Sequence, residues 1–180
     1  MIRTERLELV PGSVELLDAA LAGPDTLARV LRARVPASWP PEYVDAAALQ
    51  FTRDHLAAHP VEAPWWMYFI VLRHTPDERL LIGTSGYKGP PSEDGAVEVG
   101  YSVVAEHQRR GYASEAVEGL VRYAFAQPAV GRVIAETLPD LLPSIAVLRK
   151  SGFERAGEGS EPGVIRFERT RAARGTSGAA

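Results

Sequence analysis

The chain has 180 residues, of which 46% are apolar and 24% are charged, and its formal net charge at pH 7 is −3. This length and composition are typical of a globular domain with a full hydrophobic core, and the weakly acidic charge argues against a general nucleic-acid binder. The absence of cysteine excludes disulfides, thiolate catalysis and Cys-based zinc sites, and the four histidines lack metal-ligand spacing, so no metal is expected.

The first half of the chain changes from a helical to an extended pattern at about Trp65. Aromatic and β-branched residues dominate after that point, which favours strands. The predicted elements are a strand at 6–10, a helix from Ser13 to Ala22, a second short helix capped by Asp25, a third helix ending near Ala58, and strands at 66–73, 79–87 and 97–104. Turns at 74–78 and 89–95 join these strands, which predicts an antiparallel meander.

The second half carries a strand–helix–strand crossover and ends in a polar tail. The predicted elements are an amphipathic helix at 112–127, a strand at 132–138, a short helix from Pro143 to Ser151, and strands at 153–156 and 164–170. A right-handed crossover makes the strands that begin at Val97 and Arg132 locally parallel. We therefore predict an α+β fold in one domain, residues 1–170, followed by a flexible tail at 171–180.

The segment Gln108-Arg109-Arg110-Gly111-Tyr112-Ala113-Ser114 lies between a predicted strand and a predicted helix. The start of a helix leaves backbone N–H groups unpaired and carries partial positive charge, so it attracts anions. Gly111 lets a phosphate approach the backbone closely, and Arg109 and Arg110 add formal charge. This pattern predicts a site for a phosphate-bearing small molecule. The alternative is a plain glycine turn beside a solvated pair of arginines.

In this layout the segment resembles the acyl-CoA signature of the GNAT superfamily of N-acetyltransferases, which is Gln or Arg, two residues, Gly, one residue, then Gly or Ala. Further similarity, to the branch that contains ribosomal-protein alanine acetyltransferases, spans roughly Ile2 to Thr170. It is carried by Thr4-Glu5-Arg6-Leu7-Glu8-Leu9, Val99-Gly100-Tyr101, Tyr112-Ala113-Ser114-Glu115-Ala116, Pro143-Ser144-Ile145 and Leu148-Arg149-Lys150-Ser151-Gly152-Phe153.

The resemblance implies a mixed, mostly antiparallel sheet of about seven strands flanked by helices, with a splayed parallel pair at the acyl-CoA site. It also implies acetyl-CoA as the donor and a primary amine as the acceptor, either a protein N-terminus or a small molecule. The residues that it implies in coenzyme A binding are Val103 and Val104 beside the pantetheine arm, and Gln108, Arg109, Arg110, Gly111, Tyr112, Ala113 and Ser114 around the pyrophosphate.

Amine attack on a thioester needs a base for the ammonium group and a proton for the leaving thiolate. Glu98 and Glu136, on neighbouring strands, are the carboxylates best placed to act as the base, and the alternative for each is an ordinary carboxylate on a sheet face. A bulge in its strand would change the face that Glu98 occupies. Ser144 stands where the resembling branch has a proposed proton donor, and its alternative role is to cap the short helix.

The sequence departs from the family pattern at two positions. Leu148 stands where many members have the tyrosine that protonates the thiolate, and Leu141 stands where the branch commonly has an asparagine that bonds the pantetheine. These departures support a second hypothesis, an acyl-CoA-binding sensor or scaffold with little turnover. Release of free thiol from acetyl-CoA with a panel of amines distinguishes the two.

Trp39, Tyr87 and Tyr101 are candidates for lining the acceptor cleft, with packing against the sheet as the alternative for each. The expected partner is a small-molecule amine or a peptide N-terminus, and a homodimer is common in families of this kind. Charged residues interrupt the N-terminal apolar residues, and no apolar run approaches the length of a membrane span. These observations favour a cytoplasmic protein with neither a nucleic-acid nor a membrane partner.

Overall fold

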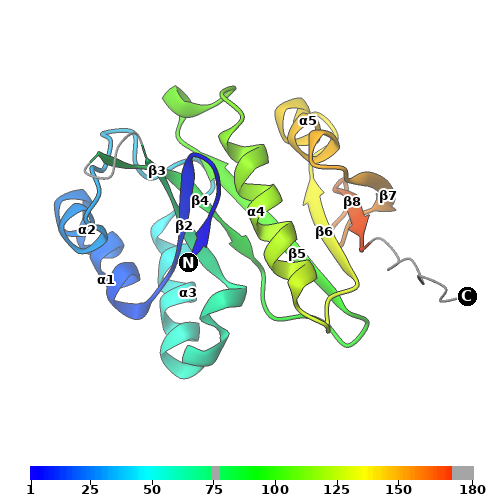
Figure 1. The fold of residues 1–180 in the computed structure, drawn as a ribbon, viewed down its shortest axis with the longest axis horizontal. Helices are drawn as coiled ribbons and strands as arrows, with labels where there is room; N and C mark the ends of the chain where they lie inside the picture. Colours follow the sequence, from blue (N-terminus) through cyan, green and yellow to red (C-terminus); the bar gives the residue numbers. More distant parts are fainter. Residues whose placement is uncertain (74–77, 172–180) are drawn as a thin grey trace, which may run out of the picture.

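The computed structural model describes residues 1–73 and 78–171, and its centre is one eight-stranded sheet in the order β1-β2-β3-β4-β5-β6-β8-β7 (Figure 1). Every neighbouring pair is antiparallel except β5 and β6. The strands are β1 (Ile2–Arg3), β2 (Leu7–Pro11), β3 (Met67–Arg73), β4 (Arg79–Tyr87), β5 (Ala96–Val103), β6 (Arg132–Thr137), β7 (Glu154–Glu158) and β8 (Ile165–Thr170).

Five helices flank this sheet. They are α1 (Val14–Ala22), α2 (Pro24–Leu31), α3 (Ala46–Ala58), α4 (Tyr112–Ala126) and α5 (Leu142–Lys150), and two short 3-10 turns, η1 (Pro60–Trp65) and η2 (Ala105–His107), also occur within the described residues. The mixed α+β fold with its mostly antiparallel sheet is confirmed. The meander and the parallel crossover strands that the sequence predicts are both present.

Three details differ from the predictions or lie beyond them. The eighth strand is β1, whose two residues are too few to give a recognisable alternation, and Ile2 pairs with Leu9. The cap of α2 is Gly23, followed by Pro24 in the first turn, so the prediction that Asp25 caps this helix is wrong. Of the predicted turn at 74–78, residues 74–77 lie outside the described residues, as do residues 172–180 of the predicted tail.

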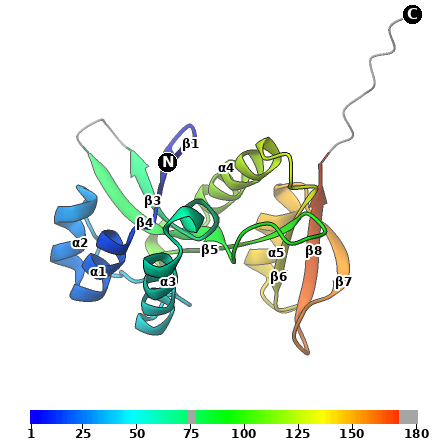
Figure 2. The ribbon, with the colours of Figure 1, turned by 90° about the horizontal axis from the view of Figure 1, so that it is seen from below.

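Two hydrophobic clusters cover the two faces of the sheet, and β3 shows how one strand contributes to both. Tyr68, Ile70 and Leu72 pack in the cluster beneath α4 and α5, whereas Phe69 and Val71 pack in the cluster beneath α1, α2 and α3. Successive strand residues point to opposite faces, so both faces are apolar here. Figure 2 shows α3 on the side of the sheet opposite α4.

The sheet splits between its two parallel strands. Pairing between β5 and β6 begins where Ala96 lies opposite Arg132 and ends where Glu98 lies opposite Ile134. Beyond that point β5 continues to pair with β4 as far as Val103, and β6 continues to pair with β8 as far as Thr137. The edge of β5 that faces β6 is therefore left without a partner strand, and the starts of α4 and α5 lie at this end of the sheet (Figure 1).

Candidate active site

The start of α4 has the backbone geometry on which the predicted anion site, here called the cradle, depends. Gly111 precedes the helix with φ 82° and ψ 2°, a left-handed conformation, and no side chain caps the helix there. Arg109, two residues earlier, also has a positive φ of 58°. Such turns direct successive backbone N–H groups to one concave side, and the first turn of α4 adds its own unpaired N–H groups. The loop thus offers several donors and the positive end of a helix to one anion.

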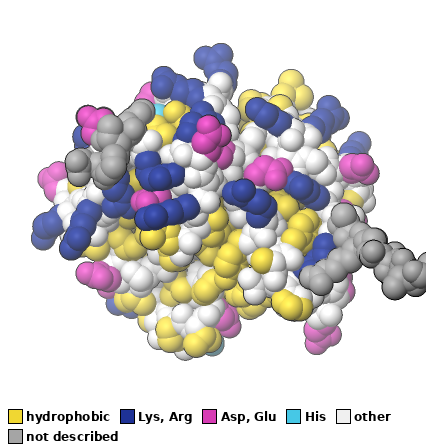
Figure 3. All heavy atoms as spheres, viewed as in Figure 1, with side chains coloured by type: hydrophobic (Ala, Val, Ile, Leu, Met, Phe, Trp, Pro, Cys, Tyr) yellow, Lys and Arg dark blue, Asp and Glu magenta, His cyan; other side chains and the backbone are white. Residues whose placement is uncertain are grey.

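Two cations that the sequence analysis did not assign to this loop lie beside Gly111. A Cβ atom built on Gly111 would lie 3.4 Å from Nη2 of Arg6 and 3.9 Å from Nζ of Lys150. Lys150 is exposed, as are Arg109 and Arg110. In Figure 3, Lys and Arg side chains gather on the upper part of this face, over the start of α4 and over α5. The cradle is therefore surrounded by positive charge from three separate segments of the chain.

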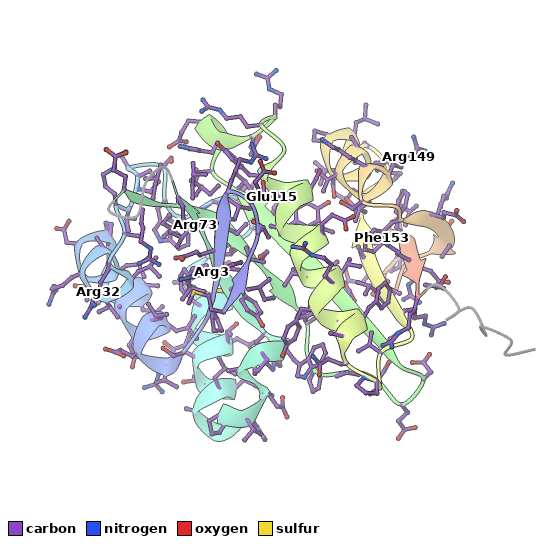
Figure 4. All side chains as sticks on the ribbon, in the orientation of Figure 1. Arg3, Arg32, Arg73, Glu115, Arg149 and Phe153 are labelled. Carbon is purple, nitrogen blue, oxygen red and sulfur yellow. The ribbon has the colours of Figure 1, made fainter. Side chains whose placement is uncertain are left out.

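Arg6 is held in this position by Glu115 and Tyr112, both in the first turn of α4. Its Nε donates to Oε2 of Glu115 at 2.7 Å, and its guanidinium lies 4.5 Å from the centre of the Tyr112 ring. Its Nη1 donates to the backbone oxygen of Arg110 at 3.1 Å. Figure 4 shows Glu115 on α4 where the N-terminal strands pass. No local pattern could have indicated these contacts, because Arg6 and α4 are far apart in sequence.

The free edge of β5 presents backbone groups toward the split. The backbone N–H of Val104 donates to the backbone oxygen of Ile82 at 2.9 Å, and the backbone N–H of Lys88 donates to the backbone oxygen of Glu98 at 3.0 Å. The even-numbered residues of β5 therefore direct their peptide groups to β4. In an antiparallel pair, only every second residue of a strand bonds to the partner strand. Tyr101 and Val103 therefore direct their peptide groups away from β4. The carbonyl of Val103 already accepts from the side chain of Gln108 at 2.9 Å.

This register corrects the prediction for Val104. Its N–H bonds to β4, and its carbonyl accepts from the backbone N–H of His107 at 2.9 Å. The peptide groups available on the free edge belong to Tyr101 and Val103 instead. The sequence could not reveal this, because which half of a strand's peptide groups faces a given neighbour depends on the register.

Two predicted site residues, Tyr101 and Ser144, meet across the split. The Tyr101 hydroxyl lies 3.1 Å from Oγ of Ser144, and it also donates to the backbone oxygen of Ser144 at 3.1 Å. Burial raises the pKa of Tyr101, and the hydrogen bond with Ser144 opposes this rise. The residue that flanks the start of α5 is Leu141, and no side-chain cap is present there. The Ser144 hydroxyl thus faces Tyr101.

Glu98 lies at the last paired position of β5 and β6, where the split begins. Val97 and Val99 pack beneath α4, so Glu98 points to the opposite face of the sheet. Pairing between β4 and β5 runs without interruption from Val103 to Val99, and no bulge changes this orientation. The carboxylate contacts the ammonium group of Lys88 and is 19% exposed. Glu98 is therefore paired with Lys88 and partly exposed at the point where the split begins.

Glu136 occupies a different environment, although it is on the same face of the sheet. Both of its oxygens are occupied: Arg166 donates to one at 2.7 Å, and the Ser160 hydroxyl donates to the other at 2.6 Å. Its side chain is only 6% exposed. Burial by itself raises the pKa of Glu136, but the hydrogen bonds from Ser160 and Arg166 outweigh burial and lower it. A carboxylate held in this way is a weak base.

The other candidates for the acceptor cleft lie apart. Tyr87 is in the core, 4% exposed, and its hydroxyl donates to the backbone oxygen of Leu120 at 2.6 Å. Trp39 is half-buried in the loop before α3, and its ring centre lies 6.0 Å from that of Phe69. This loop approaches β5, because the Ser102 hydroxyl donates to the backbone oxygen of Glu42 at 2.6 Å. Tyr87 is thus a packing residue, and Trp39 lies on the loop that adjoins the split.

The two departures from the family pattern have different consequences in the structure. Leu148 is 1% exposed and packs in the cluster beneath α4, so it fills space and offers no proton. Leu141 is half-buried and precedes α5. Tyr101 reaches the same end of α5 from β5. Its phenolic hydroxyl therefore lies beside Ser144.

Residues 6–154 match the model of a family described as Acetyltransferase (GNAT) domain. The chain is 29% identical to the uncharacterized N-acetyltransferase YjdG of Bacillus subtilis over 154 residues, which cover 85% of this chain and 89% of that protein. Similar solved structures include a putative ribosomal-protein-serine acetyltransferase from Vibrio cholerae, with a TM-score of 0.65, 18% identity, and 94% and 97% of the two chains covered. Another is the microcin C7 self-immunity acetyltransferase MccE in complex with acetyl-CoA and AMP, with a TM-score of 0.65, 13% identity, and 93% and 94% covered. Among the helices of the described residues, none is long and apolar enough to cross a membrane.

Proposed function

The chain belongs to the GNAT acetyltransferase family, and from this membership we propose that it acetylates a primary amine in the split between β5 and β6. Acetyl-CoA is the donor. The acceptor nitrogen attacks the thioester carbon, the bond between that carbon and sulfur breaks, and the acetyl group remains on nitrogen as an amide. The amine is either a protein N-terminus or a small molecule, and the name of the Vibrio cholerae relative supports the first.

The observation that carries this proposal is the continuity between the cradle and the free edge of β5. The cradle at Gly111 is suited to the pyrophosphate, and Arg6, Lys150, Arg109 and Arg110 supply charge for the phosphates. The peptide groups of Val103 and Tyr101 lie two residues apart, which is about 7 Å along a strand. The pantetheine arm contains two amide groups, and it can therefore pair with this edge as an added strand would.

For the base we propose Glu98 rather than Glu136. Glu98 lies where β5 and β6 separate, and its side chain is more exposed than that of Glu136. Glu136 is occupied by Arg166 and Ser160, and both partners would have to be displaced before it could accept a proton.

The test is release of free thiol from acetyl-CoA in the presence of an amine panel. The panel contains peptides with free and blocked N-termini, single amino acids, polyamines and aminoglycosides. We expect turnover with at least one primary amine and none with its N-acetylated counterpart. Coenzyme A binding in calorimetry, with no turnover on any amine, would favour the sensor or scaffold instead.

A further inference from the structure

We propose that Tyr101 is the residue that protonates the leaving thiolate, and that Ser144 positions its hydroxyl. The inference rests on the proposed function, because it assigns one step of that reaction. It answers the question that Leu148 raises, since no proton donor is present at that position of α5. The donor comes instead from β5, on the opposite side of the split.

The location of Tyr101 supports this role. It lies between Glu98, where the strands separate, and Val103, next to the cradle. Its peptide group is on the free edge of β5, while its side chain reaches α5 and meets Ser144. A pantetheine arm that pairs with this edge passes Val103 first and Tyr101 next, so its sulfur follows at the level where the Tyr101 side chain leaves the strand.

The chemistry also favours Tyr101 over Ser144 as the acid. A phenol has an ordinary pKa of about 10 and a thiol about 8.5, so proton transfer from phenol to thiolate is uphill by about 1.5 pKa units before burial, which raises the pKa of Tyr101 further. An aliphatic hydroxyl is a much weaker acid, and it cannot supply a proton without receiving one in the same step. Burial keeps Tyr101 protonated until the thiolate forms. The backbone oxygen and Oγ of Ser144 fix the direction of the phenol.

The step balances as follows. When the bond between carbon and sulfur breaks, its electron pair goes to sulfur, and the Tyr101 hydroxyl proton follows to give the free thiol. The phenolate that remains accepts a hydrogen bond from the Ser144 hydroxyl, which lies 3.1 Å away. The proton that the amine loses on forming the amide returns to the phenolate through water. No other reactant is consumed.

The experiment compares Tyr101→Phe, Ser144→Ala and a control, Tyr123→Phe, in the whole chain. Tyr123 is half-buried on α4 and its ring packs against Trp65, so its substitution removes a phenol away from the split. For each variant we would measure kcat with the best amine, coenzyme A affinity by calorimetry and thermal unfolding. We expect Tyr101→Phe to lower kcat about 100-fold, Ser144→Ala to lower it less than about tenfold, and both to leave coenzyme A affinity within about twofold.

Three results would overturn the assignment. The kcat of Tyr101→Phe could lie within threefold of that of the native chain. Alternatively, Ser144→Ala could lower kcat more than Tyr101→Phe does, which would make Ser144 the acid. Equal losses in both variants would mean that the hydrogen bond matters and the phenolic proton does not. A native chain that binds coenzyme A and acetylates no amine would refute the proposed function and this inference together, whereas an active native chain isolates the test of Tyr101.

Discussion

The guanidinium of Arg6 and the carboxylate of Glu115 join the N-terminal strands to the first turn of α4, with Nε and Oε2 2.7 Å apart. Glu115 also accepts from the backbone N–H of Arg6 at 2.7 Å and from the Thr4 hydroxyl. The carboxylate therefore ties down the residue whose guanidinium lies beside Gly111. Without Arg6, this carboxylate would bring negative charge close to the cradle.

The first prediction concerns Glu115 and pH. Burial by itself raises the pKa of Glu115, but the hydrogen bonds from Thr4 and Arg6 outweigh it and lower the pKa. Because the folded state prefers the ionised form, the contribution to stability is complete above about pH 4.5, the ordinary value, and is lost as the pH falls through the lowered pKa. Glu115→Gln should reduce the free energy of unfolding at pH 7 by about 1–3 kcal/mol, with a smaller difference from the native chain at pH 3.

Urea denaturation at both pH values measures this effect. Glu118→Gln is the matched control, since Glu118 lies on the same helix and pairs with Arg169 at 2.6 Å, but its side chain is 41% exposed. We expect it to cost less than about 1 kcal/mol at pH 7. A Glu115→Gln curve that stays parallel to that of the native chain from pH 7 to pH 3 would refute the role of the Glu115 charge.

The second prediction concerns the cradle. Gly111→Asp places a carboxylate where the pyrophosphate would lie and forces a side chain into φ 82°. We expect coenzyme A affinity to fall at least about 100-fold in calorimetry. Gly163→Asp is the matched control, because Gly163 has the same φ of 82° and nothing lies within 4 Å of the Cβ position. If Gly111→Asp binds coenzyme A as the control does, the cradle is not the phosphate site.

The third prediction concerns Lys150. Its Nζ lies near the cradle, so Lys150→Ala should weaken coenzyme A binding about fivefold at low salt, and less at high salt, where the charge is screened. Arg149→Ala removes a neighbouring cation that points away from α4 in Figure 4, and it should leave the affinity unchanged. Equal losses for the two variants would show that net charge alone is responsible.

The fourth prediction compares the two carboxylates. Glu98→Gln should lower kcat/KM for the amine about 100-fold with coenzyme A affinity unchanged, as expected for loss of a base. Glu136→Gln should keep kcat within about threefold, and should instead lower the free energy of unfolding by about 1–3 kcal/mol, because Arg166 loses its ionised partner. The reverse pattern would make Glu136 the base.

Much of the fold could be predicted from the sequence, because its signals are local. Ser13 caps α1 as expected, and β4 runs over the residues predicted for it. The left-handed turn at Gly111 follows from a glycine placed between a strand and a helix. Hydrophobic period, caps and turns depend on neighbours in sequence, and so did the identification of the cradle and of the family that it resembles.

The tertiary structure decided which side chains meet at the site. It turned the N–H of Val104 to β4, buried Tyr87, gave Glu136 hydrogen bonds from Arg166 and Ser160, and paired Tyr101 with Ser144. These outcomes depend on strand register and on contacts between segments far apart in the chain. The sequence by itself therefore determined the elements and the glycine turn at which we propose that the donor binds. The contacts of single residues depended on packing, because a side chain's partners are fixed only when distant segments come together.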